Sequence, residues 1–182
     1  MANNGSQGAK AAMTQMGELE KMVSESPKSD AVCLKLARIL SVHRSEIALL
    51  RLERGSLRFI FPVELRSAGV LPLTGSAVAA RTAATRTPLL SNTFMRVRHA
   101  SLFEAVRLSK GEDDQAMDQM PIQKIMSVPV VKEGSGVLGV VQVSRKGKTL
   151  AEAGPDFTHP QLRELRTISE ALAPCILLCN KA

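Results

Sequence analysis

Basic side chains are concentrated between positions 81 and 110 of this 182-residue sequence. This segment contains six Arg and Lys residues and a single acid, Glu104. The six are Arg81, Arg86, Arg96, Arg98, Arg107 and Lys110. The planar guanidinium group binds carboxylates and phosphates through paired hydrogen bonds, so one interpretation is a pocket for an anionic small molecule. The other interpretation, which the residues alone favour, is a solvated basic face.

The whole chain carries a net charge of +7, which would attract an anionic ligand, an acidic partner or nucleic acid. It contains no Trp or Tyr and only five Phe, so side chains on which bases could stack are scarce. No recognition helix accompanies the charge. We therefore expect no nucleic-acid partner.

Other reactive side chains form no recognisable catalytic or metal-binding pattern. His43, His99 and His159 lie in unrelated segments, without the spacing of metal ligands. The acids at 113, 114 and 118 hint at a cation site, but a solvated acidic turn is favoured because no calcium-loop pattern surrounds them. We expect that the chain is not an enzyme and holds no metal.

The cysteines point to the same conclusion. Cys175 and Cys179 are one helical turn apart, but no further ligands are near, so packed thiols are favoured over a metal site. With Cys33 their number is odd, unlike the disulfide framework of a small secreted protein.

The sequence shows no hydrophobic signal segment and no apolar run approaching the roughly 20 residues that span a bilayer. We expect a soluble cytoplasmic protein without a membrane partner.

The elements that would position these residues follow from hydrophobic periodicity. Apolar residues at steps of three and four predict a helix over about 9–25 and a second helix from Ser29 or Asp30 to near His43. Two strand-like runs within 47–63, joined by a turn that contains a glycine, predict an antiparallel hairpin.

The middle of the chain is less regular. Small residues predict a short helix over 75–85, and Pro88 forces the chain that follows to be extended. Alternating apolar and basic residues predict a short basic helix over 94–110, and the polar run 111–115 predicts a turn.

The last third of the chain carries the clearest signals. The runs 125–132 and 137–144 are rich in β-branched residues and predict a hairpin, in which Pro129 marks a sheet edge or bulge. Thr158 and Gln161 have the spacing of a capping box, which predicts the start of a long helix.

We expect that final helix to run from about 159 almost to the end of the chain, with a kink at Pro174. Residues 1–8 are small and polar and predict a disordered leader, so that 9–182 form a single domain. Strand hairpins with helices on one face define an α+β fold.

Three blocks of the sequence resemble the GAF domain family. Residues 73–89 hold a glycine, a small-residue helix and a Pro-Leu exit; residues 125–147 hold the paired strands; and residues 155–180 are similar to the closing helix. The resemblance implies a central antiparallel sheet with the terminal helices on one face and a ligand pocket on the other. It also implies dimerisation through those helices and a role in signalling or transcriptional regulation.

Specialised members of the family can be compared by residue. Those that reduce free methionine sulfoxide use cysteines in the variable region, whereas residues 86–121 here contain none. Cyclic-nucleotide members carry an Asn-Lys pair, a Phe and an Asp-Glu pair, of which Phe157 alone is matched, with Ser144 and Arg145 in place of the first pair.

Cofactor-binding members are not matched either. Bilin-binding members need a cysteine near the pocket, whereas the three cysteines here fall on predicted terminal helices. Haem-binding members use a pocket histidine, for which His99 is the candidate, although an exposed histidine is the favoured interpretation. The sequence therefore assigns no cofactor.

The resemblance leads to two sets of predicted site residues. A small-molecule ligand of unknown identity would lie under the segment 91–121, and we expect its polar contacts to be Asn92, Arg96, Arg98, His99 and Ser127. The alternative is a dimerising or partner-binding module whose pocket is vestigial and filled by Met117, Met120, Met126 and Leu side chains. The predicted homodimer interface consists of Ala12, Met16, Leu19, Val23, Leu165, Leu172 and Ile176.

Overall fold

The structure is a computed structural model, and it describes residues 4–25, 27–67, 69–94, 120–175 and 177–178. Within these residues, six antiparallel strands form one open sheet in the order β3-β2-β1-β6-β5-β4. The strands are β1 (Ile47–Glu53), β2 (Ser56–Phe61), β3 (Val70–Pro72), β4 (Leu89–Ser91), β5 (Ile122–Lys132) and β6 (Gly136–Lys146).

Both predicted hairpins are present. β1 and β2 are joined by Arg54 and Gly55, whose φ angles are 47° and 78°, and β5 and β6 are joined through Gly134 at 73° and Gly136 at 79°. Glycine adopts such positive φ angles without steric cost, which explains its place in these turns. The long hairpin β5–β6 forms the centre of the sheet together with β1.

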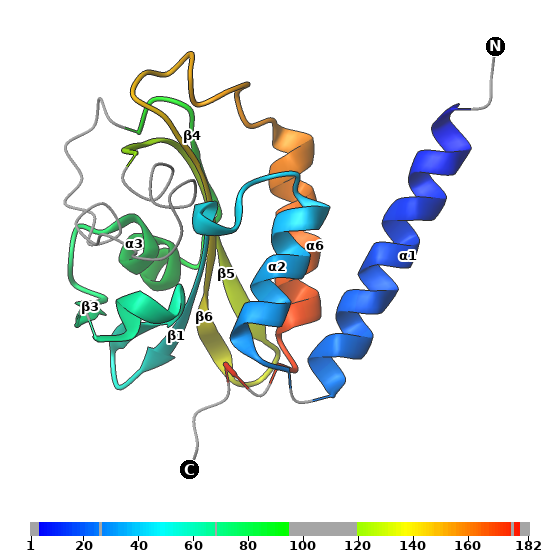
Figure 1. Cartoon of the computed structure of the whole chain (residues 1–182). Coiled ribbons are helices and arrows are strands. Elements are labelled where there is room, and N and C mark those ends of the chain that lie inside the picture. Colours follow the sequence, from blue (N-terminus) through cyan, green and yellow to red (C-terminus); the bar gives the residue numbers. More distant parts are fainter. Residues whose placement is uncertain (1–3, 26, 68, 95–119, 176, 179–182) are drawn as a thin grey trace.

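The helices divide between the two faces of the sheet (Figure 1). α2 (Ser29–Ile39) and α6 (His159–Leu172) cover one face, and α1 (Asn4–Ser24) packs on them; we call this the helix face. α3 (Val78–Thr85) packs on the opposite face, which we call the α3 face. The predicted α+β fold, with terminal helices on one face, is confirmed.

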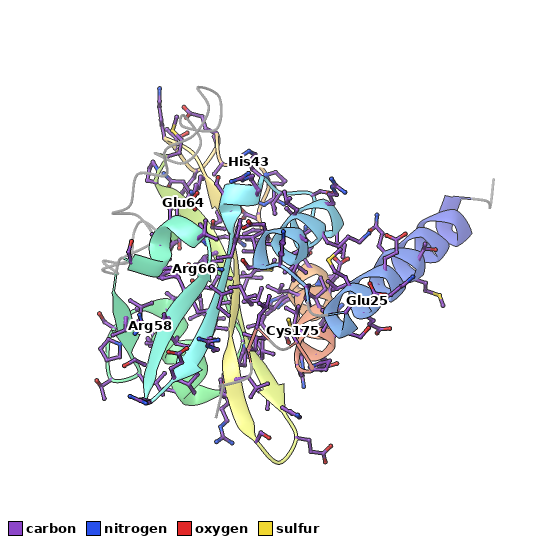
Figure 2. All side chains as sticks on the ribbon, turned by 60° about the horizontal axis from the view of Figure 1, so that its bottom comes forward. Glu25, His43, Arg58, Glu64, Arg66 and Cys175 are labelled. Atoms are coloured by element: carbon purple, nitrogen blue, oxygen red, sulfur yellow. The ribbon has the colours of Figure 1, made fainter. Side chains whose placement is uncertain are left out.

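Two short 3₁₀ helices, η1 (Arg44–Glu46) and η2 (Val63–Ser67), connect these elements. Arg66 in η2 donates one hydrogen bond from Nε to the carbonyl of Ile60, at 2.9 Å. It donates a second from Nη2 to Oγ of Ser29, also at 2.9 Å. This side chain, labelled in Figure 2, therefore ties the end of β2 to the first turn of α2.

The start of α6 is as predicted, but its end is not. Thr158 and Gln161 form the capping box, each side chain accepting from the other residue's backbone N–H. The helix ends at Leu172, two residues before Pro174, so the prediction of a kinked helix running almost to the end of the chain was wrong. Ala173 keeps helical backbone angles, but Pro174 has no N–H to continue the helical hydrogen bonds and its ring would clash with the carbonyl of Glu170, so the proline stops this helix instead of bending it.

A large apolar core fills the space between the sheet and the helix face. It includes Leu36 of α2, Leu49 of β1, Val143 of β6 and Ile168 of α6, all with no exposed surface. Burying a side chain of this size contributes about 1.5–3 kcal/mol, so this core dominates the stability of the fold.

Most of the predicted dimer residues belong to this core. Leu19, Leu165 and Leu172 are 0% exposed and Val23 is 2% exposed within a single chain, and Met16 is partly buried against them. Nothing in the structure describes the side chains of Ala12 and Ile176. The four buried side chains stabilise the chain's own fold, so a homodimer, which stays a prediction, would need other contacts.

α1 is attached to the body of the molecule mainly by its second half. It begins at Asn4, so part of the segment expected to be a leader is helical. Glu18 and Lys35 form an ion pair between α1 and α2, and this pairing lowers the pKa of the Glu18 carboxyl. Met13 is 77% exposed, and Figures 1 and 2 show the N-terminal end of α1 extending away from α2 and α6.

Two predictions for the middle of the chain lie outside the described residues. These are the basic helix over 94–110, of which only Phe94 is described, and the turn over 111–115. Among the described residues, no helix combines the length and the apolar character needed to cross a membrane.

Candidate functional site

Three polar side chains meet on the α3 face. Ser127 of β5 is directly opposite Gln142 of β6 in the ladder, and Thr82 of α3 lies over them. Thr82 Oγ1 donates to Ser127 Oγ at 2.8 Å, and Gln142 Nε2 donates to the same oxygen at 3.2 Å. Their exposed fractions are 1%, 0% and 7% for Thr82, Ser127 and Gln142, so we call these residues the buried polar trio.

The trio extends into a polar row along β6. Alternate residues of a strand point to the same face, so Gln142, Ser144 and Lys146 share the α3 face while Val141 and Val143 point into the helix-face core. Ser144 is 1% exposed and Lys146 is 5% exposed. Burying a polar group costs free energy unless it is hydrogen-bonded, so a strand serving only as core would usually carry apolar residues at these positions.

Glu46 at the end of η1 anchors this part of β6. Its Oε1 accepts the backbone N–H of Lys146 at 2.7 Å, and its Oε2 accepts that of His43 at 3.0 Å. Its carbonyl accepts from Ser144 Oγ at 3.2 Å. The carboxylate is 7% exposed and fixes the backbone on which Ser144 and Lys146 stand.

Apolar side chains flank the polar trio on both sides. On one side Val78, Phe94, Ile122 and Ile125 form a small cluster. On the other side lies a larger cluster, which includes Val140, the next residue on this face of β6. Small-molecule sites typically combine mostly apolar walls with a few fixed polar groups, and this part of the α3 face has that composition.

The structure places the predicted ligand residues in three different settings. Ser127 lies at the centre of the trio. Asn92 instead follows β4 and binds the backbone of Phe157, donating to its carbonyl at 3.0 Å and accepting from its N–H at 2.8 Å. These two bonds join the end of β4 to the loop before α6. Arg96, Arg98 and His99 lie outside the described residues.

Sequence reasoning missed Thr82, Gln142, Ser144 and Lys146. The last three were detectable, because polar residues at every second position of an otherwise valine-rich strand mark a second buried face. Thr82 carried no such signal within its small-residue helix. The prediction that Met126 fills a pocket was wrong, because it belongs to the helix-face core.

The described cysteines lie away from this site. Cys33 of α2 and Cys175, which follows α6, are fully buried in the helix-face core, and Figure 2 labels Cys175. Among the described residues, no group of three or more His, Cys, Asp or Glu side chains could hold a metal ion.

Burial raises the pKa of the Cys33 thiol, and the nearby charge of Asp30 adds to the effect. Only the thiolate reacts with alkylating reagents, so we expect Cys33 to resist iodoacetamide at about pH 8 until the chain unfolds. The folded state holds the thiol proton more tightly than the unfolded state does. The contribution of Cys33 to the free energy of unfolding is therefore complete below the ordinary thiol pKa of about 8.5 and is lost as the pH rises further. Mass spectrometry of peptides alkylated with and without urea tests this; equal labelling in both would contradict it.

Solved structures share this architecture. A GAF domain from an Acinetobacter phosphoenolpyruvate-protein phosphotransferase is 12% identical, with a TM-score of 0.64 over 92% of each chain. A putative GAF sensor protein from Burkholderia vietnamiensis is 15% identical, with a TM-score of 0.58 over 96% of this chain and 94% of the other. No protein-family model and no curated protein matches the sequence.

The comparisons correct the expectation that the chain is not an enzyme. A type II free methionine-R-sulfoxide reductase from Thermoplasma acidophilum is 14% identical, with a TM-score of 0.56 over 88% of this chain and 94% of the enzyme. An enzyme of the same kind from Staphylococcus aureus has a TM-score of 0.56 at 10% identity. Because this fold supports catalysis in both, a missing catalytic motif does not exclude an enzyme.

Proposed function

We propose that this chain, which has the GAF-domain fold, is a sensory or regulatory domain that binds a small polar molecule on the α3 face of its sheet. The buried polar trio of Thr82, Ser127 and Gln142 is the observation that carries the proposal. A role in signal transduction or transcriptional regulation is part of the same proposal.

The asymmetry between the two faces of the sheet supports this choice of site. The helix face is covered by a continuous apolar core that includes side chains from β1, β5 and β6. On the α3 face the apolar residues fall into two separate clusters, with the trio between them. Fixed hydroxyl and amide groups at such a position offer a ligand both donors and acceptors.

Charge favours a ligand with an anionic group. Lys146 stands on the α3 face of β6, two positions beyond Ser144, and the whole chain carries a charge of +7. A cationic side chain at the end of a row of neutral polar groups suits a molecule with an acidic end and a polar body.

Thermal-shift measurements on the full chain with nucleotides, organic acids and haem test the proposal. At about 100 times its dissociation constant, a ligand stabilises the folded state by about 2.7 kcal/mol. For a domain of this length that corresponds to a rise in Tm of about 5–11 °C. We expect a nucleotide or an organic acid to give such a rise.

The site is identified by comparing two variants. The rise should shrink in Gln142→Leu, which removes a polar group of the trio, and persist in Gln15→Leu, whose side chain lies on α1. If no class of compound stabilises the protein, the proposed function is wrong. If both variants respond equally, the ligand binds elsewhere.

A further inference from the structure

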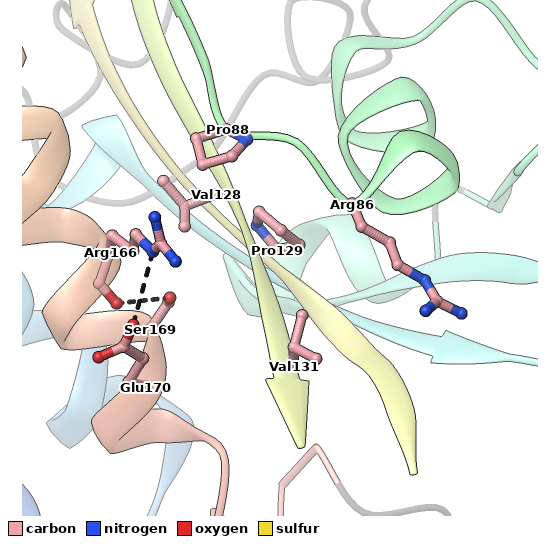
Figure 3. A pocket seen from close by; sticks show the side chains of 8 residues that line it. All are labelled: Arg86, Pro88, Val128, Pro129, Val131, Arg166, Ser169 and Glu170. Carbon is pink, nitrogen blue, oxygen red and sulfur yellow. Dashed lines mark hydrogen bonds and ion pairs between the residues drawn. The ribbon is translucent and has the colours of Figure 1, made fainter. Parts of the chain in front are cut away.

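A cavity of about 190 Å³ opens at the edge of the sheet, where β4 stops (Figure 3). The last pair between β4 and β5 is Leu89 with Ser127, although β5 continues to Lys132. From Val128 onward, no strand in the described part of the chain lies on the outer side of β5. Val131, which lines the cavity, is 42% exposed.

The backbone of this segment is an open edge. Unpaired strand edges present N–H and C=O groups that can pair with another extended chain. Pro129 has no N–H and is tolerated in a strand only where no ladder bond is needed, which agrees with its position beyond the end of β4; at this edge it offers a partner its carbonyl alone. The sequence-based prediction of a sheet edge at Pro129 is confirmed.

Cationic side chains stand on both sides of the open edge. Figure 3 shows Arg166 and Glu170 of α6 on one side of β5, and Arg86, at the end of α3, on the other. Arg86 is exposed, and Arg166 is 68% exposed. Arg166 pairs with Glu170 at 3.5 Å, an exposed pair one helical turn apart whose strength is small enough for a competing carboxylate to displace it.

We propose that this edge binds an extended acidic peptide segment of a partner protein, which pairs with residues 128–132 as an added strand. Peptide addition to a sheet edge draws its affinity from backbone hydrogen bonds and its specificity from alternate side chains. Successive side chains of a strand point to opposite faces, so two adjacent acidic residues would direct one carboxylate toward Arg86 and the other toward Arg166.

Other occupants fit this edge less well. A second copy paired edge to edge would bring Arg86, Arg166 and Lys132 of two chains into one interface, and like charges that meet at an interface are destabilising. A free small molecule would find a cavity smaller than the roughly 300 Å³ at which ligand pockets begin. An extended peptide needs only the edge and the two arginines.

Fluorescence anisotropy with the full chain and a labelled probe peptide, Thr-Val-Glu-Asp-Val-Thr-Val, tests the proposal. We expect a dissociation constant on the order of 10–100 μM, weakened at least about tenfold by high salt or by Lys-Lys in place of Glu-Asp. N-methylation of one alternate set of peptide residues should abolish binding, and methylation of the other set should not, because only one set faces β5.

Charge-matched variants locate the site. Arg86→Glu with Arg166→Glu should reduce binding at least about tenfold, since both opposed cations are reversed. Arg81→Glu with Arg163→Glu makes the same change of charge on α3 and α6 outside the cavity, so this variant should bind like the unmodified protein. Circular dichroism checks that all variants fold.

Three outcomes overturn the proposal. One is the absence of binding to the unmodified chain at about 1 mM peptide, which is weaker than specific peptide recognition. A second is equal loss of binding in both pairs of variants, or equal effects of both methylation patterns. A third is self-association of the chain in sedimentation that Arg86→Glu with Arg166→Glu changes and that the peptide does not displace. That outcome would assign the edge to a second copy.

Discussion

Replacing Gly139 by alanine is expected to destabilise the fold by about 3 kcal/mol or more, at the upper end of what overpacking a core costs. Gly139 lies in β6 between β1 and β5, opposite Arg51 and Val130. A Cβ atom there would lie 2.1 Å from the carbonyl oxygen of Leu50 and 2.9 Å from a methyl carbon of Leu178. The nearer atom is backbone in a paired strand, so the clash is relieved only by separating β1 from β6.

Thermal unfolding followed by circular dichroism measures this effect, and Gly17→Ala is the matched control. Gly17 lies within α1, and a Cβ added there would meet nothing within 4 Å. Because alanine favours the helix over glycine by about 0.5–1 kcal/mol, Gly17→Ala should stabilise the protein slightly. A Tm for Gly139→Ala within about 2 °C of the unmodified protein would show that β1 and β6 are not paired as described.

Ser127→Ala should be the next most damaging change, because it removes the acceptor of two buried donors. Each of Thr82 Oγ1 and Gln142 Nε2 would lose its partner. A buried polar group left without a partner costs about 1–3 kcal/mol, so we expect a loss of about 2–6 kcal/mol. Ser135→Ala, the same change in the exposed β5–β6 turn, should alter stability by less than about 0.5 kcal/mol.

Replacing the whole trio by apolar residues separates its structural role from its proposed binding role. Adding Thr82→Val and Gln142→Leu to Ser127→Ala removes the two donors that have lost their acceptor, so the triple variant should be more stable than Ser127→Ala alone. Urea unfolding measures each free energy. A triple variant that folds but shows no thermal shift with the ligand would identify the trio as part of the binding site; a triple variant less stable than the single one would contradict the hydrogen-bond account.

Predictions from the sequence succeeded where the signal is local. The turn glycines of both hairpins, the Thr158–Gln161 capping box and the β-branched runs of β5 and β6 each depend on a few neighbouring residues. Of the site, the sequence predicted Ser127 but not the residues that bind it. Thr82 is separated from Ser127 by 45 positions along the chain, so no local pattern relates them.

The sequence by itself therefore determined the two hairpins, the described helices and the α+β class, because propensity, periodicity and capping act within one or two turns; it predicted neither β3 nor the end of α6. Only the tertiary structure decided how side chains are used once those elements pack. It buried Leu19 and Leu172 in the chain's own core, and it bound the amide of Asn92 to Phe157, 65 positions away. It also ended β4 opposite Ser127, leaving the rest of β5 as an open edge. Each of these outcomes depends on contacts between segments that are distant in the sequence. The conformational preferences of a short segment do not specify which distant residues it will contact.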